Sequence, residues 1–465
     1  MANKAKFGSS NKKSIQKIFG TDGVRGEVGT ILTPELSLEI GYLCGRILPS
    51  EGPFLIGKDS RISGSMLCAS LIAGLTSSGR DVWDIGLCPT PAISFLIRKY
   101  KAAGGLMVSA SHNPPKDNGI KIFQQDGSKI TAEMQSEIES KLFNFYSKNK
   151  YKNIVNKFGF DFKRFDLLSD YKEHLISSVE GCDLNNKKIV LDLCWGSATS
   201  CGLEVFESLG ASIYDLHSKP NGHKINHKCG STNLKSLRQA VIQSSSDIGF
   251  AFDGDADRMI AIDKKGRVID GDHVLYLWGE HLLGKNKLPN NLLIGTVMSN
   301  LGFQRNWEEK GGKLYRTPVG DQNVYQAMVS SGASLGGEPS GHVLFAEHGL
   351  SGDGILTALK IASLCTIKGK SISELRDESF TPFPQKLVNL RLSEKANKED
   401  WKECSPIIEA LSQAEEAMGD EGRVLIRKSG TEPLLRIMVE AESTELVNTW
   451  TSRLKSIVEK YFLMI

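Results

Sequence analysis

Three aspartates at alternate positions are the residues whose chemistry is easiest to read from the sequence. They are Asp253, Asp255 and Asp257. They directly follow the apolar run Ile248–Phe252, and Arg258 closes the segment. Three carboxylates this close repel one another unless a cation lies between them, and oxygen-only ligation suits Mg²⁺. We therefore expect a magnesium loop, with Gly254 easing the curl of its backbone; an acidic surface turn is the alternative.

A serine-rich turn contains the candidate nucleophile. The chain reads Ser-Ala-Ser-His-Asn-Pro-Pro from Ser109 to Pro115, directly after an apolar stretch. This turn presents two hydroxyls and the His112 imidazole on a backbone restricted by prolines, which is a suitable mount for an activated nucleophile. A plain loop, which serine, asparagine and proline form readily, is the alternative.

Three further polar segments have side chains that suit an anionic or sugar ligand. One offers backbone amides, hydroxyls and guanidinium groups for a phosphate; its residues are Arg427, Ser429, Gly430, Thr431 and Arg436. A solvated turn is the alternative there. Another offers a carboxylate, a hydroxyl and an imidazole, which suit sugar hydroxyls or an amine; its residues are Glu338, Ser340 and His342. The last places Arg25 in the glycine-rich stretch Phe19–Gly26 and is weak evidence by itself.

The elements that must position these segments alternate between strand and helix through the first four fifths of the chain, which favours βαβ units. Strands are expected at 54–57, 81–87, 188–193 and 292–298. Strands expected at 387–392, 422–426 and 437–441, before a helix over 445–461, indicate a different, smaller C-terminal unit. We expect three serial α/β domains with mixed sheets plus an α+β domain around a central cleft. The expected bounds are a disordered tail over 1–17, α/β domains over 18–153, 154–265 and 266–380, and an α+β domain over 381–465, with linkers at 147–156, 264–266 and 380–384.

Composition describes an ordinary globular protein. The chain has 465 residues, of which 40% are hydrophobic and 24% charged, and this length exceeds one ordinary core. The net charge of +3 gives no case for nucleic-acid binding. Nine cysteines without a CxxC pair indicate free thiols in a reducing compartment. No apolar run has the length of a membrane span. We therefore expect a cytoplasmic protein without membrane or nucleic-acid partners.

Together and in this order, the five segments resemble the α-D-phosphohexomutase superfamily, and within it the bacterial phosphoglucosamine mutases. The resemblance extends from Phe19 to about Glu440. It implies an isomerase that moves a phosphoryl group within a hexose phosphate through a phosphoserine and a bisphosphate intermediate. Ser111 matches the phosphorylated serine, and Ser109 is the alternative.

The resemblance also implies roles for the other residues. The three aspartates and the phosphate on Ser111 would hold one Mg²⁺ per subunit. Lys121, with a pKa lowered by burial and arginines, would transfer the proton, and His112 and Arg25 complete the catalytic set. The implied substrate-binding residues are Glu338, Ser340, His342, Arg258, Arg427, Ser429, Gly430, Thr431 and Arg436.

An aminohexose phosphate is the substrate that the resemblance implies: glucosamine 6-phosphate and glucosamine 1-phosphate would interconvert and feed UDP-N-acetylglucosamine and cell-wall precursors. A hexosamine 1,6-bisphosphate is the expected activator, and the serine would be primed by it, by a kinase or by autophosphorylation. The sequence leaves the oligomeric state open, a homodimer included.

Two residues depart from the family pattern. Pro339 stands where phosphoglucosamine mutases commonly carry glutamine and glucose or mannose enzymes commonly carry methionine, and Trp195 stands where an asparagine is usual. Glucose and mannose phosphate mutases therefore stay as alternatives. So do two other classes, a Mg²⁺-dependent phosphatase and a non-catalytic sugar-phosphate binding protein.

Overall fold

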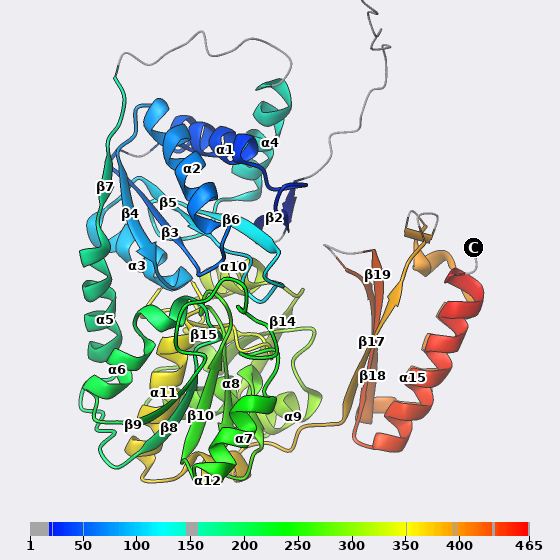
Figure 1. Cartoon of the computed structure of the whole chain (residues 1–465). Helices are drawn as coiled ribbons and strands as arrows, with labels where there is room; N and C mark the ends of the chain where they lie inside the picture. The colour runs from blue at the N-terminus through cyan, green and yellow to red at the C-terminus, as the bar shows by residue number, and fades with distance from the viewer. Residues whose placement is uncertain are drawn as a thin grey trace, which may run out of the picture.

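The computed structural model describes residues 18–20, 22–49, 51–145, 157–349, 351–393, 396–397, 399–429 and 433–463. They form four sheets with helices packed against them (Figure 1). The expected tail and the expected linker over 147–156 lie outside the described residues. Among the residues described, none of the helices has the length and apolar character of a membrane span.

The first sheet has seven strands in the order β1-β2-β6-β5-β3-β4-β7. They are β1 (Phe19–Gly20), β2 (Gly23–Glu27), β3 (Phe54–Lys58), β4 (Val82–Leu87), β5 (Gly104–Val108), β6 (Asp117–Phe123) and β7 (Asp161–Lys163). β3 is parallel to β4 and β5, whereas β6 is antiparallel to β5, so the sheet is mixed. β7 pairs with β4 in this sheet, although it lies beyond residue 153, where we expected the first unit to end.

Helices cover both faces of the first sheet, which is why its central strands are apolar without alternation. They are α1 (Pro34–Ile47), α2 (Gly64–Ser77), α3 (Thr90–Tyr100) and α4 (Ala132–Phe145). Thr33 caps α1 by accepting a hydrogen bond from the amide of Leu36, and Pro34 fits the first helical turn. The buried side chains of α1, α2 and α4 belong to one apolar cluster and those of α3 to another, so the helices lie on opposite faces.

The second and third sheets continue the pattern. The second, in the order β12-β11-β10-β8-β9, contains β8 (Lys188–Asp192), β9 (Ser212–Leu216), β10 (Ile248–Phe252), β11 (Met259–Asp263) and β12 (Val268–Ile269). The third, in the order β14-β13-β15-β16, contains β13 (Leu292–Thr296), β14 (Lys313–Thr317), β15 (Leu335–Gly337) and β16 (Val343–Phe345). Each combines parallel and antiparallel pairs. The stretch 264–266, expected as a linker, is the tight turn between β11 and β12.

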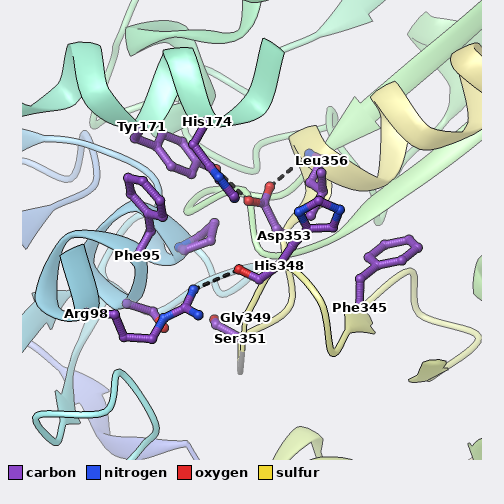
Figure 2. A pocket seen from close by; sticks show the side chains of 12 residues that line it. Phe95, Arg98, Tyr171, His174, Phe345, His348, Gly349, Ser351, Asp353 and Leu356 are labelled. Carbon is purple, nitrogen blue, oxygen red and sulfur yellow. Dashed lines mark hydrogen bonds between the residues drawn. The ribbon is translucent and has the colours of Figure 1, made fainter. Parts of the chain in front are cut away.

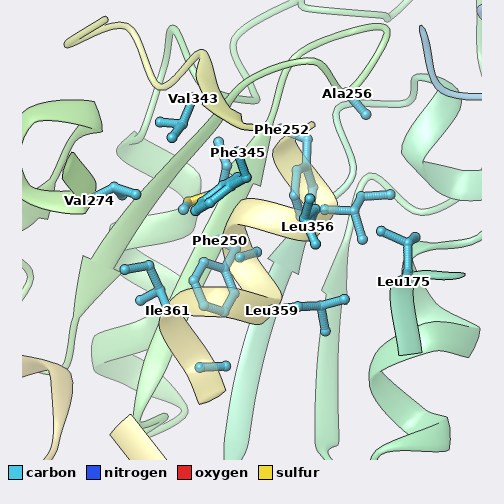
Figure 3. Close-up of a cluster of buried hydrophobic side chains, with 14 of the residues drawn as sticks. Leu175, Phe250, Phe252, Ala256, Val274, Val343, Phe345, Leu356, Leu359 and Ile361 are labelled. Carbon is cyan, nitrogen blue, oxygen red and sulfur yellow. The ribbon is translucent and has the colours of Figure 1, made fainter. Parts of the chain in front are cut away.

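Eight helices accompany these two sheets. They are α5 (Leu168–Ser177), α6 (Gly202–Ser208), α7 (Lys235–Gln243), α8 (Gly271–Gly284), α9 (Leu301–Glu309), α10 (Asp321–Ser331), α11 (Gly354–Lys368) and α12 (Ile372–Asp377). Every residue of α11 from Gly354 to Leu364 is buried, as expected of a helix enclosed on all sides. Figure 3 shows that side chains of α11 such as Leu356 and Leu359 lie in the same buried cluster as Phe250 of β10 and Phe345 of β16.

The fourth sheet stands apart from the others. It is antiparallel, in the order β17-β19-β18, with β17 (Gln385–Arg391), β18 (Gly422–Lys428) and β19 (Leu434–Ala441). Helices α14 (Ser405–Met418) and α15 (Thr444–Val458) contribute to its separate apolar cluster (Figure 1). Polar contacts connect it to the third unit: Arg423 donates to the carbonyl oxygens of Val297 at 2.9 Å and Ser299 at 2.6 Å.

Candidate active site

The candidate nucleophile lies in a strained turn after β5. Ser111 has a φ of 50°, in the left-handed region, and is fully buried. A non-glycine residue stays in this region only where its surroundings enforce it. Its Oγ donates a hydrogen bond to Oδ2 of Asp253 at 2.5 Å. The serine from the first sheet and the aspartate loop from the second therefore meet.

Arg61 fixes the backbone of this turn. Its guanidinium donates to four carbonyl oxygens at distances of 2.5 to 2.9 Å, those of Ser111, Asn113, Pro114 and Asp117. Asp59 Oδ2 accepts from Arg61 Nε at 3.0 Å and from Ser109 Oγ at 2.6 Å. Ser109 Oγ in turn accepts from the amide of Ser111 at 2.9 Å. Ser109 is therefore part of the support beneath Ser111.

The three aspartates converge in the loop between β10 and β11. One carboxylate oxygen of each lies within 4.8 Å of the others, and all three residues are buried. Asp255 Oδ1 and Asp257 Oδ1 are buried without a hydrogen-bond partner in the described part of the chain. Burial and the charges of Asp257 and Asp255 hold the pKa of Asp253 well above its ordinary value. Converging carboxylates with unsatisfied buried oxygens fit a Mg²⁺ ion.

Gly254 was expected to ease the curl of this loop, but the structure gives it a different role. The backbone passes through the left-handed region at Ala256, with a φ of 58°, and not at Gly254. A Cβ on Gly254 would lie 2.6 Å from the carbonyl oxygen of Ser111. Gly254 therefore allows the aspartate loop to approach the serine turn closely.

Lys121, on β6, lies among the aspartates. Its Nζ donates to Asp255 Oδ2 at 2.7 Å and Asp257 Oδ2 at 2.8 Å, and it lies 3.3 Å from Asp22 Oδ2. Burial lowers the pKa of Lys121, but the three carboxylates outweigh burial and hold the pKa well above its ordinary value. The expected fall in this pKa is therefore wrong for this arrangement, because carboxylates and not arginines dominate around the ammonium.

Asp22, Lys129 and Asp321 extend the charged cluster, and sequence reasoning missed all three. Asp22 forms ion pairs with Arg25 and Lys129, and Lys129 also pairs with Asp321 at the start of α10. Burial raises the pKa of Asp22, but Lys121, Lys129 and Arg25 lower it well below its usual range. One feature of the sequence could have indicated Asp22, namely its position near Arg25 in a glycine-rich turn. No such feature indicated Lys129.

His112 and Arg258 border the serine. His112 Nδ1 lies 3.3 Å from Ser111 Oγ. Burial first, and then the charges of Arg258 and Arg25, lower the pKa of His112 to about 3, so its imidazole is neutral near pH 7. The amide of Arg258 donates to Asp253 Oδ1 at 3.2 Å, and its Nε lies 3.8 Å from Asp257 Oδ1.

The expected sugar-binding residues lie between β15 and β16. Glu338 and His342 are buried, whereas Ser340 is exposed. Glu338 Oε1 accepts from the amide of Gly320 at 3.0 Å. His342 Nε2 lies 3.8 Å from Asp321 Oδ2 and 4.0 Å from Asp257 Oδ2, so it joins the aspartate cluster.

The expected phosphate-binding segment lies on the fourth sheet. Arg427 and Arg436 are directly opposite each other on β18 and β19. Like charges in this position repel, so the pair favours a bound anion. Burial and Arg436 lower the pKa of Arg427, whereas Glu338 raises it. The amide of Ser429 donates to the carbonyl oxygen of Leu434 at 2.8 Å; Gly430 and Thr431 lie outside the described residues.

Two further residues support the site from outside the expected segments. Thr90, at the start of α3, donates from its hydroxyl to Asp255 Oδ2 at 2.5 Å and from its amide to the Asp255 carbonyl at 2.9 Å. Asn226, in the loop between β9 and α7, donates from Nδ2 to the carbonyl oxygens of Ser111 at 2.7 Å and Asn113 at 3.0 Å. Both contacts join the first and second units across the site.

A small hollow is lined by residues of all three α/β units (Figure 2). Asp353 accepts from the Tyr171 hydroxyl at 2.8 Å and from the amide of Leu356 at 2.9 Å. Burial raises the pKa of Asp353 to about 6. The amide of Gly354, the residue after Asp353, donates to the carbonyl oxygen of Ala256 at 2.9 Å. The start of α11 therefore supports the aspartate loop.

Comparison with known proteins places this arrangement in a family. Models of the four domains of phosphoglucomutase/phosphomannomutase match: alpha/beta/alpha domain I at residues 16–148, domain II at 169–266, domain III at 270–383 and the C-terminal domain at 387–455. A phosphoglucosamine mutase of Prochlorococcus marinus (strain MIT 9313) is 56% identical over 448 residues, covering 96% of each chain. That of Parasynechococcus marenigrum (strain WH8102) is 56% identical over 443 residues, covering 95% of each.

Solved structures share the fold. A phosphoglucomutase/phosphomannomutase family protein of Burkholderia thailandensis has a TM-score of 0.80 at 24% identity and covers 96% of this chain and 97% of its own. An Aspergillus fumigatus N-acetylphosphoglucosamine mutase, solved with GlcNAc-6P and magnesium, has a TM-score of 0.66 at 18% identity and covers 96% of each chain. With four matching domains and relatives above half identity, the chain belongs to the phosphoglucosamine mutases of the phosphoglucomutase/phosphomannomutase family.

Proposed function

We propose that this enzyme interconverts glucosamine 6-phosphate and glucosamine 1-phosphate, with Ser111 as the residue that carries the phosphoryl group. The observation that carries the assignment is the 2.5 Å hydrogen bond from Ser111 Oγ to Asp253 Oδ2. It joins a nucleophile to a group of carboxylates in which Asp255 Oδ1 and Asp257 Oδ1 are buried without a hydrogen-bond partner in the described residues. A phosphoryl group on Ser111 would lie directly against this group. A phosphatase would have no use for the separate phosphate-binding segment of the fourth unit, and a simple binding protein would not need the nucleophile beside the carboxylates.

Asp253, Asp255 and Asp257 would hold Mg²⁺ together with the phosphate on Ser111. When bound there, the ion would neutralise charge on the oxygens of the transferring group. Arg61 and Asn226 hold the backbone of the serine turn rigid, and Thr90 holds Asp255. Positions fixed in this way lower the cost of bringing nucleophile and phosphoryl group into line.

Lys121 is the proposed proton carrier for the sugar hydroxyl. Its ammonium is stabilised while it pairs with Asp255 and Asp257. When those carboxylates are engaged by a cation, the amine loses the partners that hold its proton and becomes a better base. The neutral imidazole of His112 and the guanidinium of Arg25 border the same reaction volume.

Recognition of the substrate is assigned to two segments. Arg427, Arg436 and Ser429, with Gly430 and Thr431, would bind the phosphate that is not being transferred. Glu338, Ser340 and His342 would contact the sugar, and Arg258 would complete the substrate-binding set. Glu338 raises the pKa of Arg427, which supports a sugar segment close to the phosphate segment. The four-domain division remains part of this proposal, with β7 assigned to the first unit and β12 to the second because of their strand pairing.

The cellular setting follows from the same reaction. A hexosamine 1,6-bisphosphate is the proposed activator, because an unphosphorylated serine needs a phosphoryl donor. A kinase or autophosphorylation is the alternative priming route, and a homodimer is the proposed assembly. The nine free thiols support a cytoplasmic location, where the product would feed UDP-N-acetylglucosamine and cell-wall precursors.

The test is mutase turnover of the bisphosphate-primed protein with Mg²⁺ on glucosamine 6-phosphate, glucose 6-phosphate and mannose 6-phosphate. We expect preference for the amino sugar, and loss of turnover and of serine phosphorylation in Ser111→Ala. Phosphopeptide mass spectrometry distinguishes Ser111 from Ser109. Turnover that survives Ser111→Ala contradicts the assignment of the phosphoserine.

Pro339 matches neither the glutamine of phosphoglucosamine mutases nor the methionine of glucose and mannose enzymes, so a glucose or mannose phosphate mutase is the second candidate to test. The Pro339→Gln variant restores the residue common in phosphoglucosamine mutases. If the parent prefers glucose or mannose phosphate and this variant shifts toward the amino sugar, the second candidate replaces the first.

A further inference from the structure

Four side chains with soft or mixed metal-ligand atoms lie together in the second unit, outside the proposed catalytic set. They are Asp192, Cys194, His217 and Cys229. Asp192 ends β8 and His217 directly follows β9, so both stand at the carboxyl edge of parallel strands, where ligand sites of α/β sheets form. One ligand atom each of Asp192, His217 and Cys229 lies within 4.8 Å of the other two.

The thiol pair has the spacing of two ligands on one metal ion. Cys229 Sγ lies 3.8 Å from Cys194 Sγ. Two metal–sulfur bonds of about 2.3 Å at the tetrahedral angle place sulfurs about 3.8 Å apart. A disulfide would instead require a separation of about 2.05 Å. His217 Nδ1 lies 2.8 Å from Asp192 Oδ1, and these two atoms form one group with Cys229 Sγ. Cys194 Sγ joins this group through its approach to Cys229 Sγ.

The surroundings hold these groups in place. Asp192 Oδ1 accepts from the amide of Cys194 at 3.0 Å, and Asp192 Oδ2 accepts from the amide of Gly230 at 2.9 Å. Such outer hydrogen bonds orient ligands in metal sites. Cys194 and His217 both have left-handed backbones, with φ of 57° and 54°, so the turns that carry them are enforced by their environment.

Burial and access also suit a bound ion. Asp192, Cys194 and Cys229 are fully buried, whereas the His217 side chain is 20% exposed and gives the ion a route from solvent. The thiols are free in this structure. A set with sulfur and imidazole selects soft or borderline cations, in contrast to the all-oxygen aspartate loop, which selects Mg²⁺.

We propose that Asp192, Cys194, His217 and Cys229 form a binding site for one Zn²⁺-class divalent cation, separate from the magnesium site. Binding releases the two thiol protons to solvent, and the imidazole proton of His217 moves from Nδ1 to Nε2 so that Nδ1 is free to bind the ion. No change of oxidation state is involved.

The site connects to the serine turn through one residue. Cys194 Sγ donates to Asn226 Oδ1 at 3.1 Å, and Asn226 Nδ2 donates to the carbonyl of Ser111. A metal-bound thiolate at position 194 has no proton to donate, so Asn226 loses this contact when the site fills. The cation therefore acts on the residue that links the second unit to Ser111.

Cobalt titration of the reduced, chelator-treated full-length protein tests the site, because a cobalt–thiolate bond produces a near-ultraviolet charge-transfer band that an all-oxygen site lacks. We expect the band to saturate at one Co²⁺ per chain, to disappear on addition of Zn²⁺ and to withstand excess Mg²⁺. The Cys229→Ser variant should lose the band. Cys404→Ser, which removes a thiol of the fourth unit, is the matched control and should retain it.

His217→Ala keeps the test decisive if Cys229→Ser does not fold, because His217 is partly exposed. It should weaken Co²⁺ binding by about tenfold or more. Absence of the band in the parent protein overturns the proposal. So do its persistence in Cys229→Ser, displacement of the ion by Mg²⁺, or an unchanged affinity in His217→Ala.

Discussion

Replacing Arg61 by methionine removes the group that fixes the serine turn and leaves Asp59 as an unpaired buried charge. Both side chains of this ion pair are fully buried. Breaking a buried pair by removing one partner costs about 3–5 kcal/mol, since the remaining charge stays desolvated. The four carbonyl oxygens lose the hydrogen bonds from Arg61 as well, although Asn226 still donates to those of Ser111 and Asn113. We expect the free energy of unfolding of Arg61→Met to fall by this amount at pH 7, measured by urea denaturation.

The pH dependence of this loss identifies its cause. Burial raises the pKa of Asp59 above its ordinary value, and Arg61 opposes that rise. Without Arg61 the folded-state pKa rises further, whereas the unfolded-state value stays at about 3.9. An acid with a raised folded-state pKa contributes a loss of stability that grows as pH rises from the unfolded to the folded pKa. The part of the Arg61→Met defect that comes from the Asp59 charge should therefore be small near pH 4 and full above the raised pKa, so the total loss should be smaller at pH 4 than at pH 7.

Two controls complete the experiment. Arg61→Met combined with Asp59→Asn removes the buried charge and should recover part of the loss. Arg164→Met breaks a surface pair with Asp166 and should cost less than about 1 kcal/mol. A loss below about 1 kcal/mol in Arg61→Met, or an equal loss at pH 4 and pH 7, refutes the reasoning.

Three other perturbations give distinct results. Lys121→Met should lower kcat by about 10²–10⁴-fold while strengthening Mg²⁺ binding in a metal titration, because the ammonium that competes for Asp255 and Asp257 is gone; weaker Mg²⁺ binding contradicts this. Thr90→Val removes the hydroxyl that orients Asp255 and should weaken Mg²⁺ binding by about tenfold in the same titration, with an unchanged circular dichroism spectrum. Burial raises the pKa of Asp353 to about 6, so its ionisation should lower the free energy of unfolding by roughly 2–3 kcal/mol as pH rises from about 4 through 6; Asp353→Asn should remove this fall, and an identical pH profile for both proteins rules the effect out.

The parts of the fold that sequence predicted are those with a local signal. The apolar runs expected at 54–57 and 188–193 are β3 and β8, and the mixed α/β architecture is confirmed. β7 had no such signal, because its three residues are exposed and show no apolar pattern. Its pairing with β4 is what makes it a strand. The turn at 264–266 has the composition of a linker. Only the pairing of the flanking strands β11 and β12 identifies it as a turn within a sheet.

The site divides in the same way. Ser111 and the three aspartates have neighbours in sequence that mark them. The ion pair between Lys129 and Asp321 joins positions 192 residues apart, so no local pattern could indicate it. The pKa of Lys121 depends on three carboxylates that reach it from two separate segments, Asp22 from one and Asp255 and Asp257 from the other. We predicted the wrong direction for this pKa because only the folded arrangement sets that number.

The distribution of apolar cores has a consequence for how the chain unfolds. One cluster contains side chains from Leu55 in the first unit to Phe380 at the end of the third, whereas the cluster of the fourth unit draws only on residues beyond Val388. Elements that share a core gain and lose their burial free energy together, and elements with separate cores do so independently. The second apolar cluster of the first unit shares strands β3 and β5 with the large cluster, so the first three units should melt as one cooperative block and the fourth as another. Destabilising changes in β8 and in β3 would both lower the free energy of unfolding of the same block. A change in α15 would lower that of the fourth unit alone.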